Sequence, residues 1–244
     1  MKRTHVAERL GIDRRRFLEA SAGAVGSLFL AACDSMGPKS AQGLLKFAET
    51  KNETLERVLL RHTSIDAASG KAAGSAFPSY FVSHQVPVWD EATRGAWKLE
   101  VGGMVKTPLS LSLNDLSSMP RIGYKLDHFC VEGWTAVATR TGVKVSDIAK
   151  LAGVDPAAKY VDFQSFDDDY HESWDIESAM HPQTLVVYAQ DGHYLNPSWG
   201  VPARVYSPTK LGYKNTKFLT RIMFMPARIG GYWSDRGYEW YGGL

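Results

Sequence analysis

Two stretches of this sequence hold the residue types best suited to chemistry, and the first surrounds a cysteine. Cys130 stands in the run Asp127-His128-Phe129-Cys130-Val131-Glu132-Gly133-Trp134. A thiolate is a soft ligand, suited to a soft or high-valent transition metal. Lys125 and His128 are close in sequence, and a neighbouring cation lowers the pKa of a thiol. The run is therefore a candidate metal site, although a lone buried cysteine is more often a small apolar residue of the core.

The same cysteine also allows a second interpretation. Residues two apart on a strand point to the same face, so His128 could serve as the base for a nucleophilic Cys130. One cysteine cannot make a structural zinc site alone. The remaining histidines show no close metal-binding spacing.

The second stretch is rich in glycine, proline and cations. It begins with Gly200-Val201-Pro202-Ala203-Arg204 and continues to Lys210, Lys214 and Lys217, with Gly212 and Asn215 among them. A loop of this kind can bind a phosphate through its backbone and its lysines. The alternative is an exposed loop with scattered lysines.

The elements that must position these residues indicate an α+β fold with mixed sheets and short helices. Apolar and polar residues alternate at 97–101 and 161–165, as expected for strands. Two further segments are also interpreted as strands. One face would carry Leu126, His128 and Cys130 in the first, and Phe218, Thr220, Ile222 and Phe224 in the second. Residues 185–188 form a short buried run. Ser146 is predicted to cap a helix over Asp147–Ala152, which Gly153 would end. The regular strand–helix alternation of a doubly wound sheet and the glycine-rich dinucleotide fingerprint are both missing.

The N-terminal residues 1–33 have the pattern of an export signal. Asp13-Arg14-Arg15-Arg16-Phe17-Leu18 precedes an apolar run from Ala20 to Ala32 that is too short to span a bilayer comfortably. The segment resembles a twin-arginine signal, and its end, Leu30-Ala31-Ala32-Cys33, resembles a lipoprotein processing site. We expect a lipidated Cys33. The alternatives are cleavage nearby or a basic amphipathic helix of the mature protein.

Residues 34–76 are predicted to be a spacer with a short helix, and residues 77–244 the functional domain. Leu55, Val58, Leu59 and His62 are spaced for one helical face, with Asn52 or Thr54 as possible caps. The small residues of 69–75 favour a flexible joint.

Composition narrows the function classes. The chain has 244 residues, a net charge of only +2 and 44% hydrophobic residues, which suits a globular domain and gives no sign of a nucleic-acid binder. Its two cysteines, Cys33 and Cys130, exclude a disulfide framework.

Together, the two chemical stretches resemble the sulfite oxidase superfamily. The match is closer to its bacterial periplasmic molybdoenzymes, the branch that includes the methionine sulfoxide reductase catalytic subunit. It rests on Cys-Val-Glu-Gly-Trp at 130–134, on Gly-Val-Pro-Ala-Arg at 200–204 and on Lys-Leu-Gly-Tyr-Lys-Asn-Thr-Lys at 210–217. Residues 83–88 and 179–185 also resemble the family. The similarity extends from Phe77 to about Phe224.

The resemblance implies a molybdenum-molybdopterin cofactor, with one pterin per molybdenum, in a fold of the sulfite oxidase type. Cys130 would be the catalytic metal ligand. Arg204 would bind the pterin or its phosphate. The other implied cofactor-binding residues are His84 and Ser165 at the pterin, and Asn215, Thr216 and Lys217 around the phosphate, partly through backbone N–H groups.

The implied activity is two-electron oxygen-atom transfer, with reduction of a small sulfoxide-like substrate as the first expectation. A separate electron-transfer partner, such as a membrane haem protein, would supply the electrons. The arginine pair that follows the cysteine in sulfite oxidases is replaced by Glu132-Gly133-Trp134, which disfavours sulfite oxidation unless Arg140 faces the site. Non-catalytic binding of a pterin or small ligand by an exported lipoprotein is the remaining alternative.

Two further features bear on the site. Trp199 stands where the family has Asn or His at the cofactor, which predicts a reshaped pterin pocket. The C-terminal residues Tyr232, Trp233, Tyr238, Trp240 and Tyr241 either line an entrance or pack on the core.

Overall fold

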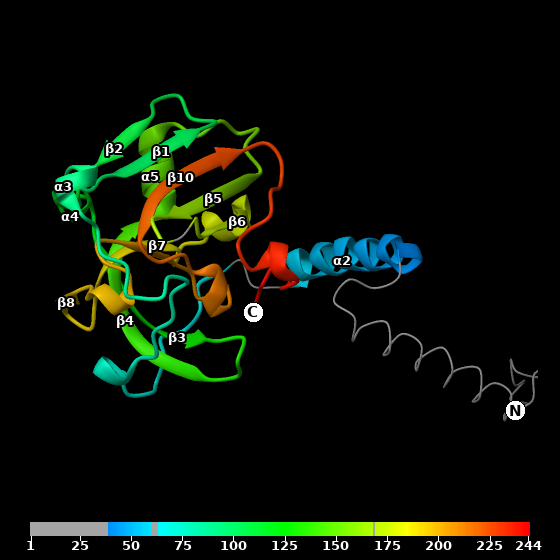
Figure 1. Ribbon diagram of the computed structural model, residues 1–244, viewed down its shortest axis with the longest axis horizontal. Coiled ribbons are helices and arrows are strands. Elements are labelled where there is room, and N and C mark those ends of the chain that lie inside the picture. The colour runs from blue at the N-terminus through cyan, green and yellow to red at the C-terminus, as the bar shows by residue number, and fades with distance from the viewer. Residues whose placement is uncertain (1–38, 60–62, 168) are drawn as a thin grey trace, which may run out of the picture. The chain divides into compact units, whose positions relative to one another are not determined.

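The computed structural model describes residues 39–59, 63–167 and 169–244. The predicted export signal and Cys33 lie outside these residues. The chain divides into two compact units, 1–55 and 56–244. Every described strand lies in the second unit, which also contains both chemical stretches (Figure 1).

Helix α2 spans Lys39–Leu59 and is longer than the sequence pattern predicted. Asn52 and Thr54 therefore lie inside the helix and do not cap it, which corrects that prediction. Residues 44–51 are mostly good helix formers, so the helix extends well before the apolar face that suggested it. His62 is outside the described residues. Among the helices that the structure describes, none is both long and apolar enough to cross a membrane.

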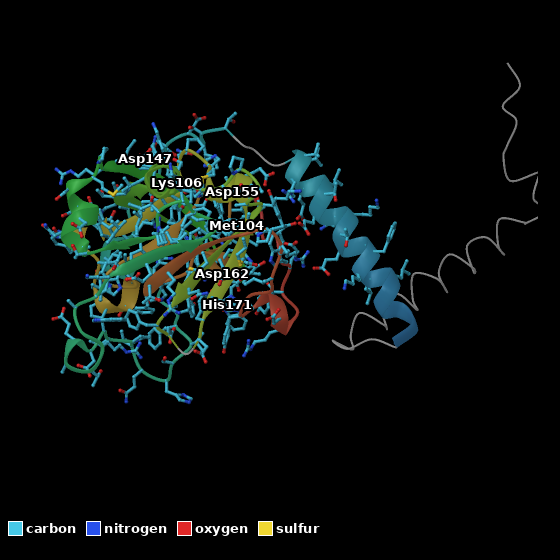
Figure 2. The ribbon with its side chains drawn as sticks, turned by 90° about the horizontal axis from the view of Figure 1, so that it is seen from above. Met104, Lys106, Asp147, Asp155, Asp162 and His171 are labelled. Atoms are coloured by element: carbon cyan, nitrogen blue, oxygen red, sulfur yellow. The ribbon has the colours of Figure 1, made fainter. Side chains whose placement is uncertain are left out.

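The first sheet contains five strands in the order β2-β1-β10-β5-β6. Their bounds are β1 Leu99–Gly103, β2 Leu109–Leu111, β5 Tyr160–Ser165, β6 His171–Asp175 and β10 Leu219–Met225. Strand β1 pairs with β10 in parallel, whereas the other pairs are antiparallel, so the sheet is mixed. On its β5–β6 edge, His171 Nδ1 lies 2.9 Å from Asp162 Oδ1 (Figure 2).

The second sheet has the strand order β3-β4-β7-β8, and β9 pairs with β7. These strands are β3 Ile122–Phe129, β4 Thr135–Lys144, β7 Leu185–Gln190, β8 His193–Tyr194 and β9 Arg204–Tyr206. All their pairings are antiparallel. Mixed sheets with short helices confirm the predicted α+β class.

Short helices join the strands. They are α3 Glu91–Arg94, α4 Leu113–Ser118, α5 Val145–Ala152 and α6 Ile176–Ala179, with 3₁₀ turns at Gly74–Ala76, Pro197–Trp199, Gly212–Lys214 and Ser234–Arg236. The main apolar core draws buried side chains from both sheets and from α5. Two smaller clusters lie along the second sheet, one around Leu126 and one around Phe77.

Helix α5 begins earlier than predicted and lacks the expected cap. Its N-cap residue is Lys144, which makes no side-chain capping bond, and Ser146 lies within the first turn. Burial of Val145 and Ile148 in the main core outweighs the serine capping preference. Gly153 ends the helix in the left-handed conformation, as predicted.

Strand β10 also differs from its predicted pattern. The register with β5 shifts between Leu219 and Arg221. The shift places Leu219 and Ile222 in the core, whereas strict alternation predicted that only even-numbered residues share a face. Phe218 precedes the strand with a φ of 55°.

The segment predicted to be a flexible joint is hydrogen-bonded to the second sheet. The backbone N–H of Ala68 donates to Lys125 O at 2.9 Å, and that of Ala73 donates to Val137 O at 2.8 Å. Gly70 packs closely on the Val137 side chain. Through these contacts residues 68–77 run along β3 and β4, and Phe77 lies at the candidate site.

Candidate active site

The cysteine lies in the short connection between β3 and β4. Strand β3 ends at Phe129, so Cys130 follows the strand and does not continue its alternation. The Cys130 N–H donates to Trp134 O, and the Gly133 N–H donates to Cys130 O, each at 3.0 Å. Gly133 has a φ of 86°, a conformation that glycine adopts without strain. This tight turn leaves the Cys130 thiol half-buried at the wall of a cavity.

The cavity has a volume of about 370 Å³, within the range of small-molecule and cofactor sites. Segments far apart in the sequence build it: residues 77–82, the Cys130 connection, the end of β5, the loops around β9 and the C-terminal aromatics. Its lining residues are Phe77, Pro78, Tyr80, Phe81, Val82, His128, Cys130, Val131, Glu132, Trp134, Ser165, Asp167, Tyr170, Arg204, Gly212, Tyr213, Asn215, Lys217, Phe218, Trp233 and Tyr238.

Five of the seven predicted site residues line this cavity: Cys130, Ser165, Arg204, Asn215 and Lys217. The other two, His84 and Thr216, are not at its wall. His84 is exposed, in the segment that follows the cavity residue Val82. Thr216 is fully buried, and its hydroxyl has no hydrogen-bond partner among the described residues.

A second hollow lies between the loops that follow β1 and α5. It is lined by residues 103–106 and 153–156, including Met104, Lys106 and Asp155 (Figure 2). It contains none of the predicted site residues, so the cavity at Cys130 is the candidate active site.

Two cations line one part of the cavity, the buried Arg204 and the half-buried Lys217. Arg204 is 4% exposed and donates to Trp199 O at 3.4 Å and to Asn215 O at 3.2 Å, while its Nε has no hydrogen-bond partner within the part of the chain that the structure describes. Burial, reinforced by the nearby Arg140, lowers the pKa of Arg204 to about 9. The Lys217 ammonium donates to Ser198 O at 3.2 Å and to Ser79 Oγ at 3.4 Å.

The Lys217 amine is strongly perturbed. Burial and, next, the charge of Arg204 lower its pKa to about 7, although Asp167 opposes the shift. Among the described residues, neither Arg204 nor Lys217 forms an ion pair with a carboxylate. An anion would relieve both uncompensated charges.

The Asn215 side chain mainly stabilises the loop that contains it. Its side-chain oxygen accepts from the Ser207 N–H at 2.7 Å, and its amide nitrogen donates to Lys210 O and Leu211 O. The backbone N–H groups of Asn215 and Thr216 donate to Gly212 O and Lys214 O. The structure thus commits these two N–H groups to the loop, whereas the sequence suggested that they face a phosphate.

The local charges correct the predicted activation of Cys130. Burial lowers the pKa of His128 well below its usual value, and Arg140, Arg204 and Lys217 lower it further, so the imidazole is neutral. It cannot act as the cation that was expected beside the thiol. Burial raises the pKa of Cys130, and the Glu132 carboxylate adds to that rise, whereas backbone N–H groups oppose it.

The nucleophile–base alternative has no support in the geometry. Cys130 Sγ contacts the side chain of Glu132, whose Oε2 lies 3.9 Å away. Within the described part of the chain, His128 Nδ1 has no hydrogen-bond partner. The His128 ring instead packs among Phe77, Trp134 and Tyr206.

Arg140 lies behind the cavity wall and does not face the site. It is fully buried, and its guanidinium lies 3.8 Å from the Tyr206 ring centre and 5.1 Å from that of Phe77. None of its three side-chain nitrogens has a hydrogen-bond partner among the described residues. Arg140 therefore does not replace the arginine pair missing after Cys130.

Trp199 also lies outside the cavity lining. Its ring packs edge-on against Phe77 with centroids 6.5 Å apart, and its carbonyl accepts from Arg204. The C-terminal aromatics divide between both predicted roles: Trp233 and Tyr238 line the cavity, whereas Trp240 and Tyr241 are buried in the fold.

Sequence reasoning missed several cavity residues. Asp167 accepts from the backbone N–H groups of Val82 and Ser83 at 2.8 and 3.0 Å and so fixes the segment after Phe77. Tyr170 also lines the cavity and is half-buried, and its hydroxyl donates to Tyr213 O. The sequence did offer one signal for Asp167, because this carboxylate comes shortly after the predicted strand 161–165.

Comparison with known proteins identifies the family of the chain. The profile of the family described as "Oxidoreductase molybdopterin binding domain" matches residues 84–233, more than half of the chain. The chain belongs to this family. It is therefore a molybdenum-cofactor oxidoreductase, and its cofactor is molybdenum-molybdopterin.

Relatives cover the chain to different extents. The Azospira oryzae protein named "Putative protein-methionine-sulfoxide reductase subunit YedZ1" is 34% identical over 233 residues, 94% of this chain and 87% of that protein. The uncharacterized oxidoreductase YuiH of Bacillus subtilis is 32% identical over 158 residues, 64% of this chain and 78% of its own length. The protein-methionine-sulfoxide reductase catalytic subunit MsrP of Xanthomonas axonopodis is 34% identical over 164 residues, covering 60% of this chain and 50% of MsrP.

A solved structure agrees on the fold. The sulfane dehydrogenase SoxCD of Paracoccus pantotrophus matches with a TM-score of 0.51 and 22% identity, covering 54% of this chain and 38% of that one. At this identity the likeness supports the fold alone, and it confirms the expected sulfite-oxidase-type architecture.

The residues of the cavity fit the cofactor of the family. The cofactor carries an anionic phosphate, and the cavity offers two cations, Arg204 and Lys217, that form no ion pair with a carboxylate among the described residues. The Cys130 thiol, a soft donor, lines the same cavity. The unpartnered Nε of Arg204 is an orphaned buried donor that such a ligand could satisfy.

Proposed function

We propose that this chain is the catalytic subunit of an exported oxidoreductase that reduces a sulfoxide-like substrate. The observation that carries the proposal is the cavity itself, where a soft thiol and two uncompensated cations line one chamber. When bound, the cofactor supplies two-electron oxygen-atom transfer. The reaction consumes one sulfoxide, two electrons and two protons, and yields one sulfide and one water.

The residues have distinct roles in this proposal. Cys130 would ligate the metal, and Arg204 and Lys217 would bind the anionic part of the cofactor. Ser165 lines the cavity, and its hydroxyl accepts from the Asp167 N–H at 2.9 Å. The hydroxyl proton could be donated to the pterin. His84 and Thr216 remain proposed cofactor residues, although neither lines the cavity.

Electrons must come from a separate partner, and a membrane haem protein is the class we propose. The related proteins are named as subunits, which supports such a division of labour. The twin-arginine-like signal and the cysteine at its end support export to the periplasm and a lipid anchor at Cys33. The anchor would hold the enzyme at the membrane surface, beside its electron donor.

Sulfite-type oxidation is the second candidate reaction, and the charges around Cys130 disfavour it. Sulfite recognition needs fixed cations. The Glu132 carboxylate lies beside Cys130, while Arg140 is buried behind the cavity wall. Pterin or small-ligand binding without turnover stays the alternative from another class.

Metal content and turnover together test the proposal. Protein from a host that makes the cofactor should hold about one molybdenum per chain and reduce a methyl sulfoxide with viologen dye as the electron donor. Cys130→Ala should abolish the activity, and Cys130→Ser should leave at most a small remnant. Full activity in Cys130→Ala would refute the role of the thiolate. Loaded protein that oxidises sulfite but reduces no sulfoxide would reverse the assigned direction.

A further inference from the structure

The carboxylate of Glu132 is held at the Cys130 end of the cavity by two aromatic residues. The Trp134 indole N–H donates to Glu132 Oε2 at 3.1 Å. The Tyr80 ring stacks on Trp134 with centroids 6.2 Å apart and an interplanar angle of 24°. A hydrogen bond with Glu132 is the largest cause of the raised pKa of the Tyr80 phenol. An otherwise exposed carboxylate is thus fixed in place.

This arrangement gives the cavity charges of both signs. The charges of Arg140, Arg204 and Lys217 all lower the pKa of His128. The Glu132 carboxylate lies beside Cys130, with its Oε2 3.9 Å from Sγ, and its charge helps to raise the pKa of the thiol. An anionic phosphate is therefore favoured at Arg204 and Lys217, while an anion that approaches Cys130 meets a negative charge.

The rim beside Glu132 is apolar and aromatic. Tyr80 is 57% exposed, Val131 47% and Tyr238 40%, and all three line the cavity. Such a rim can receive the apolar substituents of a neutral substrate. A cationic substituent can also lie against the tyrosines or near the carboxylate.

We propose that Glu132 is a specificity-determining residue that favours neutral and cationic oxygen-bearing substrates over anionic ones at the Cys130 end of the cavity. The inference rests on the proposed function and names the charge class of its substrate. It assigns a role to the carboxylate that stands where sulfite oxidases have cations.

A matched series of sulfoxides tests the proposal in the cofactor-loaded enzyme. N-acetylmethionine sulfoxide, its amide, and methioninamide sulfoxide carry the same reacting group and, at about pH 6, a charge of −1, 0 or +1. The wild-type kcat/KM should rise in that order. In Glu132→Gln, the ratio of the neutral to the anionic substrate should fall about fivefold, the scale of one unit charge at a solvated distance of several ångström.

A matched control separates a local charge from net charge. Glu91→Gln removes the same charge from the exposed helix α3, and its substrate ratio should equal that of the wild type. Molybdenum content and near-ultraviolet circular dichroism identify variants that have not folded. An unchanged ratio in folded, loaded Glu132→Gln would overturn the proposal.

A second measurement does not depend on sulfoxide turnover. Full-length protein from a host without the cofactor is treated with iodoacetamide or iodoacetate, which are neutral and anionic versions of one reagent. Mass spectrometry follows alkylation of the Cys130 peptide, and the ratio of the two rates cancels changes in thiolate population. Glu132→Gln should lower the iodoacetamide-to-iodoacetate ratio several-fold relative to the wild type and to Glu91→Gln.

The two measurements distinguish the two hypotheses. A wild type that reduces none of the three sulfoxides contradicts the proposed function, while the alkylation ratio still tests the Glu132 charge. An alkylation ratio that Glu132→Gln leaves unchanged contradicts the Glu132 inference, even when the sulfoxides are reduced.

Discussion

Three cations lie in or behind the cavity, and their charges lower the stability of the folded chain when no anionic ligand is bound. Arg140 and Arg204 are 0% and 4% exposed, and Lys217 lies beside them with a depressed pKa. A buried cation without a partner destabilises the folded chain. The anionic cofactor would compensate these charges, so the same residues should oppose folding in its absence and support it when it is bound.

Arg140→Met should therefore change stability in opposite directions in the two forms. In cofactor-free protein the substitution removes a fully buried charge with three unpartnered nitrogens and should stabilise by about 1–2 kcal/mol. In loaded protein it should weaken retention of the cofactor, because a cation behind the site is lost. Urea unfolding of both forms and molybdopterin release provide the measurement.

Arg121→Met is the matched control, since Arg121 is exposed. We expect it to change stability by less than about 0.5 kcal/mol in either form. Equal destabilisation of both forms by Arg140→Met would mean that the side chain serves packing against Tyr206 and not the charge of the site.

Lys217 should make anion binding depend on pH. Its pKa is about 7 in the absence of a ligand, so it is largely protonated at pH 6 and largely neutral at pH 8.5. Because an anion binds the protonated amine, affinity should fall as pH rises through 7, and binding above pH 7 should take up a proton. Sulfate does not titrate in this range and is a suitable probe for calorimetry with cofactor-free protein.

Lys217→Met should flatten that pH profile and weaken sulfate binding at pH 6 about tenfold, the scale of a hydrogen bond to a charged group. Lys159→Met removes a lysine outside the cavity lining and should leave the profile intact. A wild-type affinity that is constant from pH 6 to 8.5 would show that Lys217 does not contact the anion.

At this scale the sequence grouped residues that lie together better than it predicted their protonation states. Cys130, Ser165, Arg204, Asn215 and Lys217 line one cavity, and their roles at the cofactor stay a prediction. Proximity in sequence suggested that His128 would be a cation, but burial among other cations keeps it neutral. Burial is a property of the folded chain, which is why no spacing rule could reveal it.

At the scale of elements, buried ion pairs fix the loop that carries Asn215 and Lys217. Lys214 Nζ donates to Glu172 Oε2 of β6 at 2.5 Å, and both side chains are fully buried. Lys210 Nζ donates to Asp175 at 3.0 Å and to the Tyr241 carbonyl at 2.7 Å. The loop is thus tied both to the first sheet and to the C-terminal segment.

Lys214→Met should cost about 3–5 kcal/mol, because it leaves the Glu172 carboxylate buried and unpaired. Glu172 also accepts from the Trp233 N–H, so the damage should reach the cavity wall. The double variant Lys214→Met/Glu172→Gln should regain part of the loss. Urea unfolding and molybdenum content measure both effects, and a single-variant cost below about 1 kcal/mol would show that the pair does not hold the loop.

The elements themselves were predictable where a local rule agreed with tertiary packing. Gly153 ended α5 as expected, because the left-handed position requires a residue such as glycine. Ser146 did not begin the same helix, since Val145 and Ile148 are drawn into the core. The bulge in β10 placed Leu219 on an unpredicted face, and a bulge depends on the partner strand, which sequence periodicity does not include.

At the scale of the whole molecule, the cavity is built from connections of both sheets. Cys130 and Arg204 belong to the second sheet or its loops, whereas Ser165 is the last residue of β5 and Phe218 directly precedes β10 in the first. Most lining residues lie outside the strand ladders, in 77–82, 130–134 and 212–218. Segments without a ladder open more readily than strands, so they depend most on the bound cofactor.

Hydrogen exchange should therefore separate the two forms of the full chain by segment. In loaded protein, amides in 77–82, 130–134 and 212–218 should exchange at least tenfold more slowly than in cofactor-free protein, since a ligand bound only by the folded form suppresses local opening. Strands β1 and β2 contribute no lining residue and should change little. Uniform protection of all segments would indicate that the cofactor stabilises the fold globally, and protection confined to 130–134 would mean that Arg204 and Lys217 do not bind it.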